Sequence, residues 1–217
     1  MSKPLADIAG ETERVRRLAD RQAPRYDRQI SMFERLLFGD GRRWATSQVS
    51  GEVLEIAAGT GRNFEYYAPD TNLTAIELSQ EMLQIARQRA DTAEIQIDLR
   101  EGDAQALEFP DDSFDRILIT LALCTIPDDR KAAEEAYRVL RPGGRLVLLE
   151  HVRSPIAAVR FIQRLLQPLA LRFEGDNLVR EPLDYLADIG FQVETVQRLK
   201  WGIVERIVAR KPQRGTA

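Results

Sequence analysis

The chain of 217 residues carries a formal net charge of −3 at pH 7, with 30% charged and 44% hydrophobic residues. This length suits one α/β domain with a full core, and the mixed charges give no overall field that would attract nucleic acid. One cysteine and one histidine exclude an internal disulfide and the usual metal constellation, so we expect no bound metal and a cytoplasmic setting. No apolar run approaches the roughly 18 residues of a membrane span, and the first residues lack a signal-peptide core, so we expect a soluble protein.

The first predicted element is a charged helical region over residues 11–29, for which a solvated arm is the alternative. Beyond it, strand and helix patterns alternate, which indicates a mostly parallel sheet. Ser79 has the character of a helix N-cap, and Arg141-Pro142-Gly143-Gly144 predicts a turn. The predicted strands span residues 51–56, 73–77, 94–101, 114–120 and 144–151, and the predicted helices span 62–67, 79–90 and 129–140.

The last third of the chain begins with an amphipathic pattern over residues 156–173, where apolar residues recur at helical spacing with arginines on another side. A helix that packs against the core is one interpretation of this pattern. A further helix is expected to begin near Glu181. Two β-like runs, residues 191–199 and 203–211, are separated by only three residues, too few for a crossover helix. They therefore predict an antiparallel hairpin that finishes the sheet.

The most informative segment is the apolar run that ends in a turn of small residues at Ala57, Gly59 and Gly61. Glycine lets a backbone turn sharply and approach a ligand where a Cβ atom would collide. Glu77 closes the next predicted strand, and a carboxylate there can accept hydrogen bonds from both ribose hydroxyls. These features predict a site for a nucleoside cofactor. A nicotinamide dehydrogenase is the weaker alternative, because no third glycine follows Gly61 in G-x-G-x-x-G spacing and the terminal hairpin is foreign to such sheets.

The segment Glu55-Ile56-Ala57-Ala58-Gly59-Thr60-Gly61 resembles the E-x-G-x-G-x-G loop of the class I S-adenosylmethionine-dependent methyltransferases, with Ala57 in place of the first glycine. The resemblance covers nearly the whole chain. It implies an α/β fold with a Rossmann-like seven-stranded, mostly parallel sheet, a C-terminal antiparallel hairpin and helices on both faces. It also implies S-adenosylmethionine as cofactor, S-adenosylhomocysteine as product, and these cofactor-binding residues: Glu55, Ala57, Gly59, Gly61, Glu77, Ser79, Met82, Asp103, Ala104 and Leu121.

Within this class, Tyr26-Asp27 and the segment 138–144 resemble the branch that contains UbiE-type quinone methyltransferases and bacterial phospholipid N-methyltransferases. Segments 120–124, 150–152 and 175–181 are similar to small methyltransferases that include animal alkyl-thiol S-methyltransferases. The resemblance implies transfer of a methyl group to a small, lipophilic acceptor. A thiol is favoured, a phenol or quinol oxygen and an ethanolamine nitrogen are the alternatives, and a noncatalytic cofactor-binding interaction subunit is the alternative of another class.

Four residues outside the cofactor motifs are candidates for the acceptor chemistry. His151 lies at the carboxyl end of the fifth predicted strand, where open α/β sheets bind ligands, and an imidazole there can take a proton from an acceptor. A structural histidine is the alternative. Tyr26 is a catalytic candidate that closes over the site or donates a hydrogen bond, or else an anchor for its helix. Cys124 and Arg180 are substrate-binding candidates, although a lone cysteine is more often a small buried hydrophobe.

The resemblance divides the single domain into four parts: residues 1–48 as a helical cap, 49–152 as the cofactor-binding core, 153–181 as a lid or acceptor-site insertion, and 182–211 as the last helix and hairpin. The helix predicted in the insertion suits the role of a lid. Its arginines also suit contact with an anionic membrane surface, which is considered but not favoured. The partner is then a small-molecule acceptor, and the oligomeric state stays open.

Overall fold

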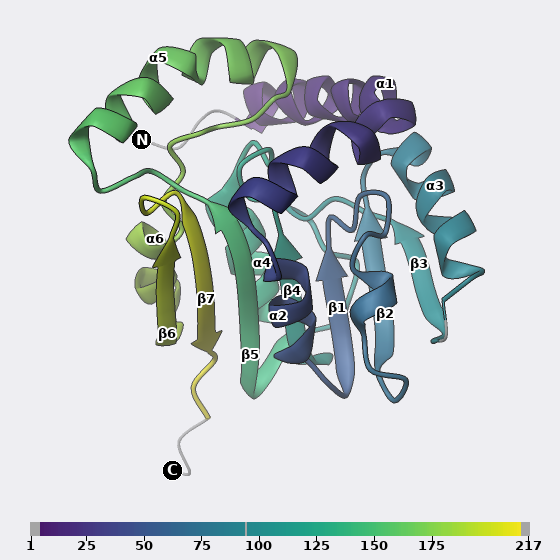
Figure 1. The fold of residues 1–217 in the computed structure, drawn as a ribbon. Coiled ribbons are helices and arrows are strands. Elements are labelled where there is room, and N and C mark those ends of the chain that lie inside the picture. Colours follow the sequence, from purple (N-terminus) through teal and green to yellow (C-terminus); the bar gives the residue numbers. More distant parts are fainter. Residues whose placement is uncertain (1–4, 94, 214–217) are drawn as a thin grey trace.

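The protein forms one seven-stranded sheet with helices on both faces in a computed structural model that describes residues 5–93 and 95–213 (Figure 1). The strands lie in the order β3-β2-β1-β4-β5-β7-β6, and β7 runs antiparallel to both of its neighbours while the other pairs are parallel. This arrangement confirms the predicted fold class. The strands are β1 (Glu52–Ile56), β2 (Asn72–Glu77), β3 (Ile97–Glu101), β4 (Phe114–Thr120), β5 (Leu140–His151), β6 (Gln192–Leu199) and β7 (Val204–Arg210).

Two apolar cores lie on opposite faces of the sheet because side chains alternate along each strand. In β1, Leu54 and Ile56 join the core formed with α4 and α6, whereas Val53 joins the core formed with α2, η1 and α3. The sheet interior is accordingly fully buried. The helices are α1 (Leu5–Leu37), α2 (Gly41–Ser47), the 3₁₀ turn η1 (Phe64–Tyr66), α3 (Gln80–Ala90), α4 (Asp129–Val139), α5 (Ala157–Phe173) and α6 (Leu183–Ile189).

Most predicted elements are confirmed, including the N-cap of α3, where the Ser79 hydroxyl accepts a hydrogen bond from Met82 N. The helix predicted over 62–67 is wrong, because the chain forms only a 3₁₀ turn there. The turn predicted at 141–144 is a bulge within β5. Leu140, before it, pairs with Phe114 of β4, and Arg145, after it, pairs with Arg116, so the register shifts between these two pairs. Glu94, where the third strand was predicted to begin, lies outside the described residues. Residues 1–4 also lie outside them, and they begin the N-terminal segment that was predicted to lack a signal peptide.

Two long helices, α1 and α5, lie over the end of the sheet at which the parallel strands finish (Figure 1). The α5 helix confirms the amphipathic pattern over 156–173, but core packing is the wrong interpretation, since α5 buries none of its described residues. No helix in the described part of the chain is both long and apolar enough to cross a membrane. The loops after β1, β2, β3, β4 and β5 therefore open into a space bounded by α1 and by the chain around α5.

Candidate active site

The loop after β1 turns through three left-handed residues, Ala57 (φ 56°), Gly59 (φ 59°) and Gly61 (φ 77°). A residue with a Cβ atom pays about 1–2 kcal/mol to adopt this conformation, which explains why glycine is preferred at the position that Ala57 occupies. Gly59 N donates to Glu77 Oε2 at 2.9 Å, and Ser79 N donates to Glu77 Oε1 at 2.8 Å. The Glu77 carboxylate thus fixes the loop after β1 against the loop after β2.

A cavity lies directly beyond this loop, at the ends of β1, β2, β3 and β4. Burial raises the pKa of Glu77 even though backbone N–H donors oppose the shift. Leu121 is another left-handed residue (φ 55°) and follows β4. Strained backbone of this kind is commonly found at functional sites. Among the residues that line the cavity are eight predicted for the cofactor: Ala57, Gly59, Glu77, Ser79, Met82, Asp103, Ala104 and Leu121.

This lining fits the nucleoside of S-adenosylmethionine. One carboxylate, Glu77, is placed for a pair of ribose hydroxyls, and a second, Asp103, lies at the end of β3. Met82, Ala104 and Leu121 provide apolar surface for a planar base. The donor set and the apolar walls therefore agree with the cofactor that the sequence motifs predict.

Two residues predicted to bind the cofactor do not line this cavity. The Glu55 side chain is directed to the residues around η1 and not into the cavity. Its carboxylate accepts hydrogen bonds from Asn63 Nδ2 at 2.8 Å and Tyr67 Oη at 2.7 Å. Gly61 (φ 77°) serves the packing of the loop, because a Cβ atom there would lie 2.4 Å from the Phe64 ring. Both residues therefore contribute to the packing and hydrogen bonding around the loop after β1, without lining the cavity.

The α1 helix lines the cavity with Val15, Ala19 and Tyr26, among others, and three acidic residues spaced by seven attach it to the rest of the protein. Asp20 accepts a hydrogen bond from Ser79 Oγ at 2.6 Å, and Asp27 accepts one from Thr60 Oγ1 at 2.6 Å. Glu34 forms ion pairs with two arginines of the core, Arg42 and Arg62. A spacing of seven keeps residues on one side of a helix, so these carboxylates form a single row that faces the core.

A second cavity adjoins the first and contains the acceptor-side candidates. Five residues line both cavities, so an acceptor in the second would face a cofactor in the first: Gln22, Tyr26, Leu121, Thr125 and Glu174. The second cavity is also lined by Gln29, Ile30 and Phe33 of α1 and by Cys124, His151, Asp176 and Leu178.

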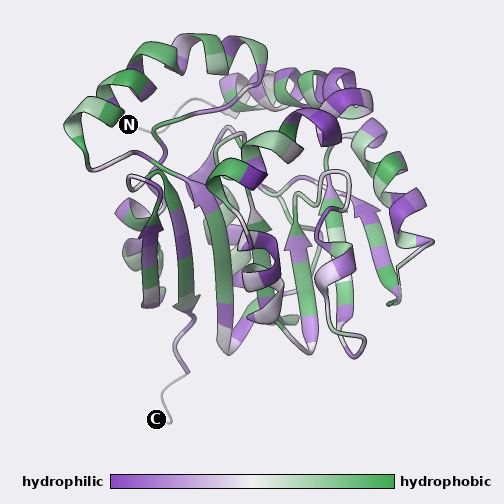
Figure 2. Ribbon diagram, in the orientation of Figure 1, coloured by the Kyte–Doolittle hydropathy of each residue, from purple (hydrophilic) through white to green (hydrophobic). Residues whose placement is uncertain are grey.

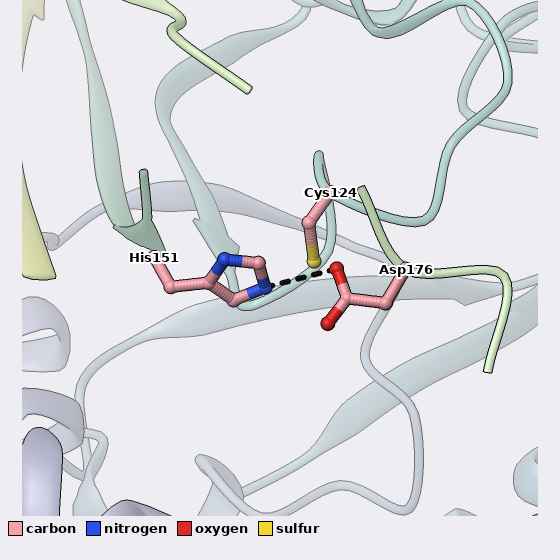
Figure 3. Close-up of side chains that lie close together, drawn as sticks. All are labelled: Cys124, His151 and Asp176. Carbon is pink, nitrogen blue, oxygen red and sulfur yellow. Dashed lines mark ion pairs between the residues drawn. The ribbon is translucent and has the colours of Figure 1, made fainter. Parts of the chain in front are cut away.

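Three side chains from separate loops meet in the second cavity, Cys124, His151 and Asp176 (Figure 3). His151 Nε2 lies 3.0 Å from Asp176 Oδ1, and both side chains are largely withdrawn from solvent. Burial lowers the pKa of His151, but the charges of Asp176, Glu150 and Glu174 and the contact with Asp176 outweigh it, so the pKa is raised from 6.5. Burial raises the pKa of the Cys124 thiol well above its usual value, which keeps it a neutral thiol. Of these three side chains, His151 beside Asp176 is therefore the candidate for accepting a proton in this cavity.

The ligand atoms of Cys124, His151 and Asp176 all lie within 4.8 Å of one another. The composition argument against a metal constellation did not foresee that one cysteine and one histidine would meet a carboxylate.

The other two candidates have clear positions. Tyr26 lies where the two cavities join, and burial raises its pKa to about 12, so its hydroxyl stays protonated and is a donor. Arg180 does not line the acceptor cavity. It donates to Asp129 Oδ1 at 2.5 Å and to Ile126 O at 2.7 Å. Arg180 thus fastens the loop before α6 to the start of α4, and its assignment as a substrate-binding residue has no counterpart in the geometry.

The fold and the cofactor cavity define a class I methyltransferase, and comparisons with known proteins agree. Residues 54–148 match the family model described as "Methyltransferase domain". A demethylmenaquinone methyltransferase of Thermus thermophilus is 36% identical over 70% of this chain and 73% of its own length. A demethylmenaquinone methyltransferase of Renibacterium salmoninarum is 30% identical over 92% of each chain.

Among solved structures, a SAM-dependent methyltransferase from Thermotoga maritima superposes with a TM-score of 0.70 at 22% identity, over 90% of this chain and 99% of that one. The chain belongs to the UbiE-like branch of the class I S-adenosylmethionine-dependent methyltransferases. It is a methyltransferase that uses S-adenosylmethionine. The predicted preference for a thiol finds no support among these relatives, and neither does a noncatalytic subunit.

Sequence reasoning missed the partner of His151 and the attachment of α1. Asp176 lies in a segment that carried the narrower resemblance, but no role was assigned to it. The row of Asp20, Asp27 and Glu34 had a visible signal in its spacing of seven. The dense arginines around these acids concealed that signal, because charged runs are usually solvated.

Proposed function

We propose that this methyltransferase acts on a quinol or a related hydroxylated aromatic ring, and that the His151–Asp176 pair accepts the hydroxyl proton. The observation that carries the proposal is this buried pair, 3.0 Å apart, in a cavity that adjoins the cofactor site. A phenolic hydroxyl is a poor nucleophile until its proton is removed, whereas a thiolate or a neutral amine needs no such group. The names of the relatives, which mention demethylmenaquinone, agree with this acceptor class.

The second cavity suits a ring of this kind. Ile30, Phe33, Leu121 and Leu178 supply apolar surface, and the Tyr26 hydroxyl is a protonated donor at the junction with the cofactor cavity. Apolar walls with a few placed polar groups are the usual composition of a small-molecule site. The walls also exclude water from the acceptor once it is bound.

Bound S-adenosylmethionine would supply a methyl group on a sulfonium, which is electrophilic. The acceptor hydroxyl gives its proton to the His151–Asp176 pair, and the electron pair left behind makes the oxygen and the neighbouring ring carbons nucleophilic. One of these atoms would form the new bond to the methyl carbon while the methyl–sulfur bond breaks, and S-adenosylhomocysteine would leave as a neutral thioether. When the atom is carbon, its ring proton is lost afterwards and the hydroxyl is formed again. The protein contributes by positioning the acceptor and by holding the proton.

The test is mass spectrometry of products formed from methyl-deuterated S-adenosylmethionine with a panel of quinols, phenols, thiols and ethanolamine lipids dispersed in detergent. We expect a labelled quinol or phenol, with the fragment pattern revealing methylation on carbon or oxygen. His151→Ala should lower its turnover by about 10²–10⁴-fold and leave cofactor affinity unchanged. Glu101→Ala, which changes an exposed residue outside both cavities, is the control and should stay within a few-fold of the native rate.

The pH profile adds a readout that a structural role would not move. The neutral imidazole accepts the proton, so kcat/KM should rise with pH and level off above a midpoint higher than 6.5, since the pKa of His151 is raised. Asp176→Asn should move this midpoint downward, because burial then acts without its main opposing charge. Methylation of thiols alone, or a profile that His151→Ala does not alter, would refute the proposal.

A further inference from the structure

The α5 helix has an unusual orientation, because its polar side faces the protein. Gln163 Nε2 donates to Val152 O at 2.8 Å and to Leu178 O at 2.9 Å. Gln167 accepts from Leu178 N and donates to Asn177 Oδ1, both at 2.8 Å. These amides hold the helix against the loop that contains Asp176. The side of α5 that an ordinary amphipathic helix would bury is consequently directed outward.

The outward side of α5 is a continuous apolar surface. Phe161 is 68% exposed and Leu165 is 67% exposed, and monomeric soluble proteins rarely expose large contiguous apolar patches. Figure 2 shows the apolar segments of this helix along the outer edge of the molecule, beyond the ends of the parallel strands. We call this surface the α5 stripe; it consists of Phe161, Ile162, Leu165, Leu166, Leu169 and Phe173.

Positive charge accompanies the stripe. The α5 helix contains three arginines, Arg160, Arg164 and Arg172, and its sequence has no acidic residue. Arginines beside an exposed apolar helix face complement a surface that is apolar inside and anionic outside. A protein partner would need acidic and apolar groups in register with them, whereas a lipid headgroup layer provides this combination everywhere.

The second half of α1 continues the same chemistry to the mouth of the acceptor cavity. Phe33 lines that cavity, and the neighbouring Met32 and Leu36 are 70% and 63% exposed. Arg28 and Arg35 are exposed on the same helix. Apolar and basic groups therefore occur both on α5 and beside the opening through which an acceptor would enter.

We infer that the α5 stripe, together with Met32 and Leu36, docks on an anionic lipid surface, so that a lipophilic acceptor passes from the bilayer into the cavity lined by Phe33. Docking itself follows from the surface; delivery of the acceptor rests on the proposed function. The apolar side chains enter the boundary between headgroups and acyl chains, and the arginines contact lipid phosphates. The acceptor then reaches the His151–Asp176 pair without crossing water.

The experiment is co-sedimentation of the full chain with vesicles of phosphatidylcholine alone and of phosphatidylcholine mixed with phosphatidylglycerol. We expect binding to the mixed vesicles that weakens with added salt, as screening requires. Phe161→Ser/Leu165→Ser should weaken this binding by at least about tenfold, since two large apolar side chains lose their burial in lipid. The matched control is Val193→Ser/Val196→Ser, which removes two exposed apolar side chains of β6 and should bind as the native chain does.

Cofactor affinity and thermal unfolding of both double variants verify that they are folded. A native chain that stays in the supernatant with both vesicles overturns the inference. So does a dimer in vesicle-free solution that Phe161→Ser/Leu165→Ser dissociates, because a second copy then covers the stripe. Quinol methylation in detergent is scored separately: docking without methylation refutes only the proposed function, and methylation without docking refutes only this inference.

Discussion

The α1 and α5 helices lie over the same end of the sheet, but they are attached in opposite ways. The carboxylates of Asp20, Asp27 and Glu34 fasten α1 to the core and to the cofactor loop. The α5 helix is held by two glutamine amides, and its apolar side faces outward. The difference indicates that α1 forms part of the wall of both cavities, whereas α5 supports the loop that contains Asp176 and presents a surface.

The largest expected effect is on the free energy of unfolding, and it compares an apolar residue of the core with one of the α5 stripe. Leu186→Ala removes a fully buried side chain from the core beneath α6 and should lower the free energy of unfolding by about 2–5 kcal/mol. Leu165→Ala, the same change on the α5 stripe, should stay within about 0.5 kcal/mol of the native value. Urea unfolding measures both. A large loss for Leu165→Ala would mean that the stripe is packed, and the contrast would fail.

The next effect concerns the cofactor side. Glu77→Ala should weaken S-adenosylmethionine binding on the order of 100-fold in calorimetry, because the carboxylate is lost both as a ribose acceptor and as the acceptor of Gly59 N. Glu101 pairs with Glu77 in the register of β3 with β2 and is exposed. Glu101→Ala is therefore the matched control and should retain native affinity. Equal affinities for the two variants would exclude Glu77 from the site.

A smaller effect distinguishes the attachment of α1 from the attachment of α5, through cofactor affinity and the acceptor KM. Asp27→Asn leaves Arg89 and Thr60 without a charged partner and should weaken cofactor affinity about tenfold. Gln167→Ala should leave cofactor affinity unchanged and raise the acceptor KM about fivefold, since it frees the loop at Leu178. Calorimetry and steady-state kinetics on the same preparations make the comparison. If both variants changed the same parameter, the division of labour between α1 and α5 would be wrong.

The smallest effect is a pH dependence of the free energy of unfolding, caused by the buried carboxyl group of Glu55 beside the cofactor loop. Burial raises the pKa of Glu55 to about 7, although Tyr67 and Asn63 oppose the shift. The stability that this group contributes is present below its unfolded pKa of 4.5 and is lost as the pH rises through about 7. The native unfolding free energy should therefore fall from about pH 5 to about pH 8, and Glu55→Gln should reduce that fall by about 1 kcal/mol or more. Glu101→Gln should leave the slope unchanged.

The sequence predicted the secondary structure correctly where it depends on neighbouring residues alone. The strand endings at Ile56, Glu77 and Thr120 follow from apolar runs that stop at polar or small residues. The Ser79 N-cap follows from side-chain chemistry alone. Local pattern was misleading over residues 62–67, where the chain forms only a 3₁₀ turn and Phe64 packs against Gly61.

The site shows the same division between local and long-range information. The turn after β1 and the carboxylate of Glu77 could be recognised from local pattern, and the resemblance to the family supplied the other predicted cofactor residues. The grouping of Cys124, His151 and Asp176 was beyond such reasoning, since Cys124 follows β4, His151 ends β5 and Asp176 follows α5, and they meet only when those elements are adjacent. The contact of Arg180 with Asp129 was beyond local pattern for a related reason, as the two residues lie 51 positions apart in the sequence.

The sequence by itself determined the sheet, the cofactor and the amphipathic character of α1 and α5, since periodicity and short motifs depend on neighbouring residues. Only the tertiary structure decided which side of each helix faces inward and which groups share the acceptor cavity. Periodicity separates a polar from an apolar side but does not say what either side will meet. That depends on the partners available: carboxyl acceptors for Ser79 and Thr60 on α1, and backbone carbonyls for Gln163 on α5.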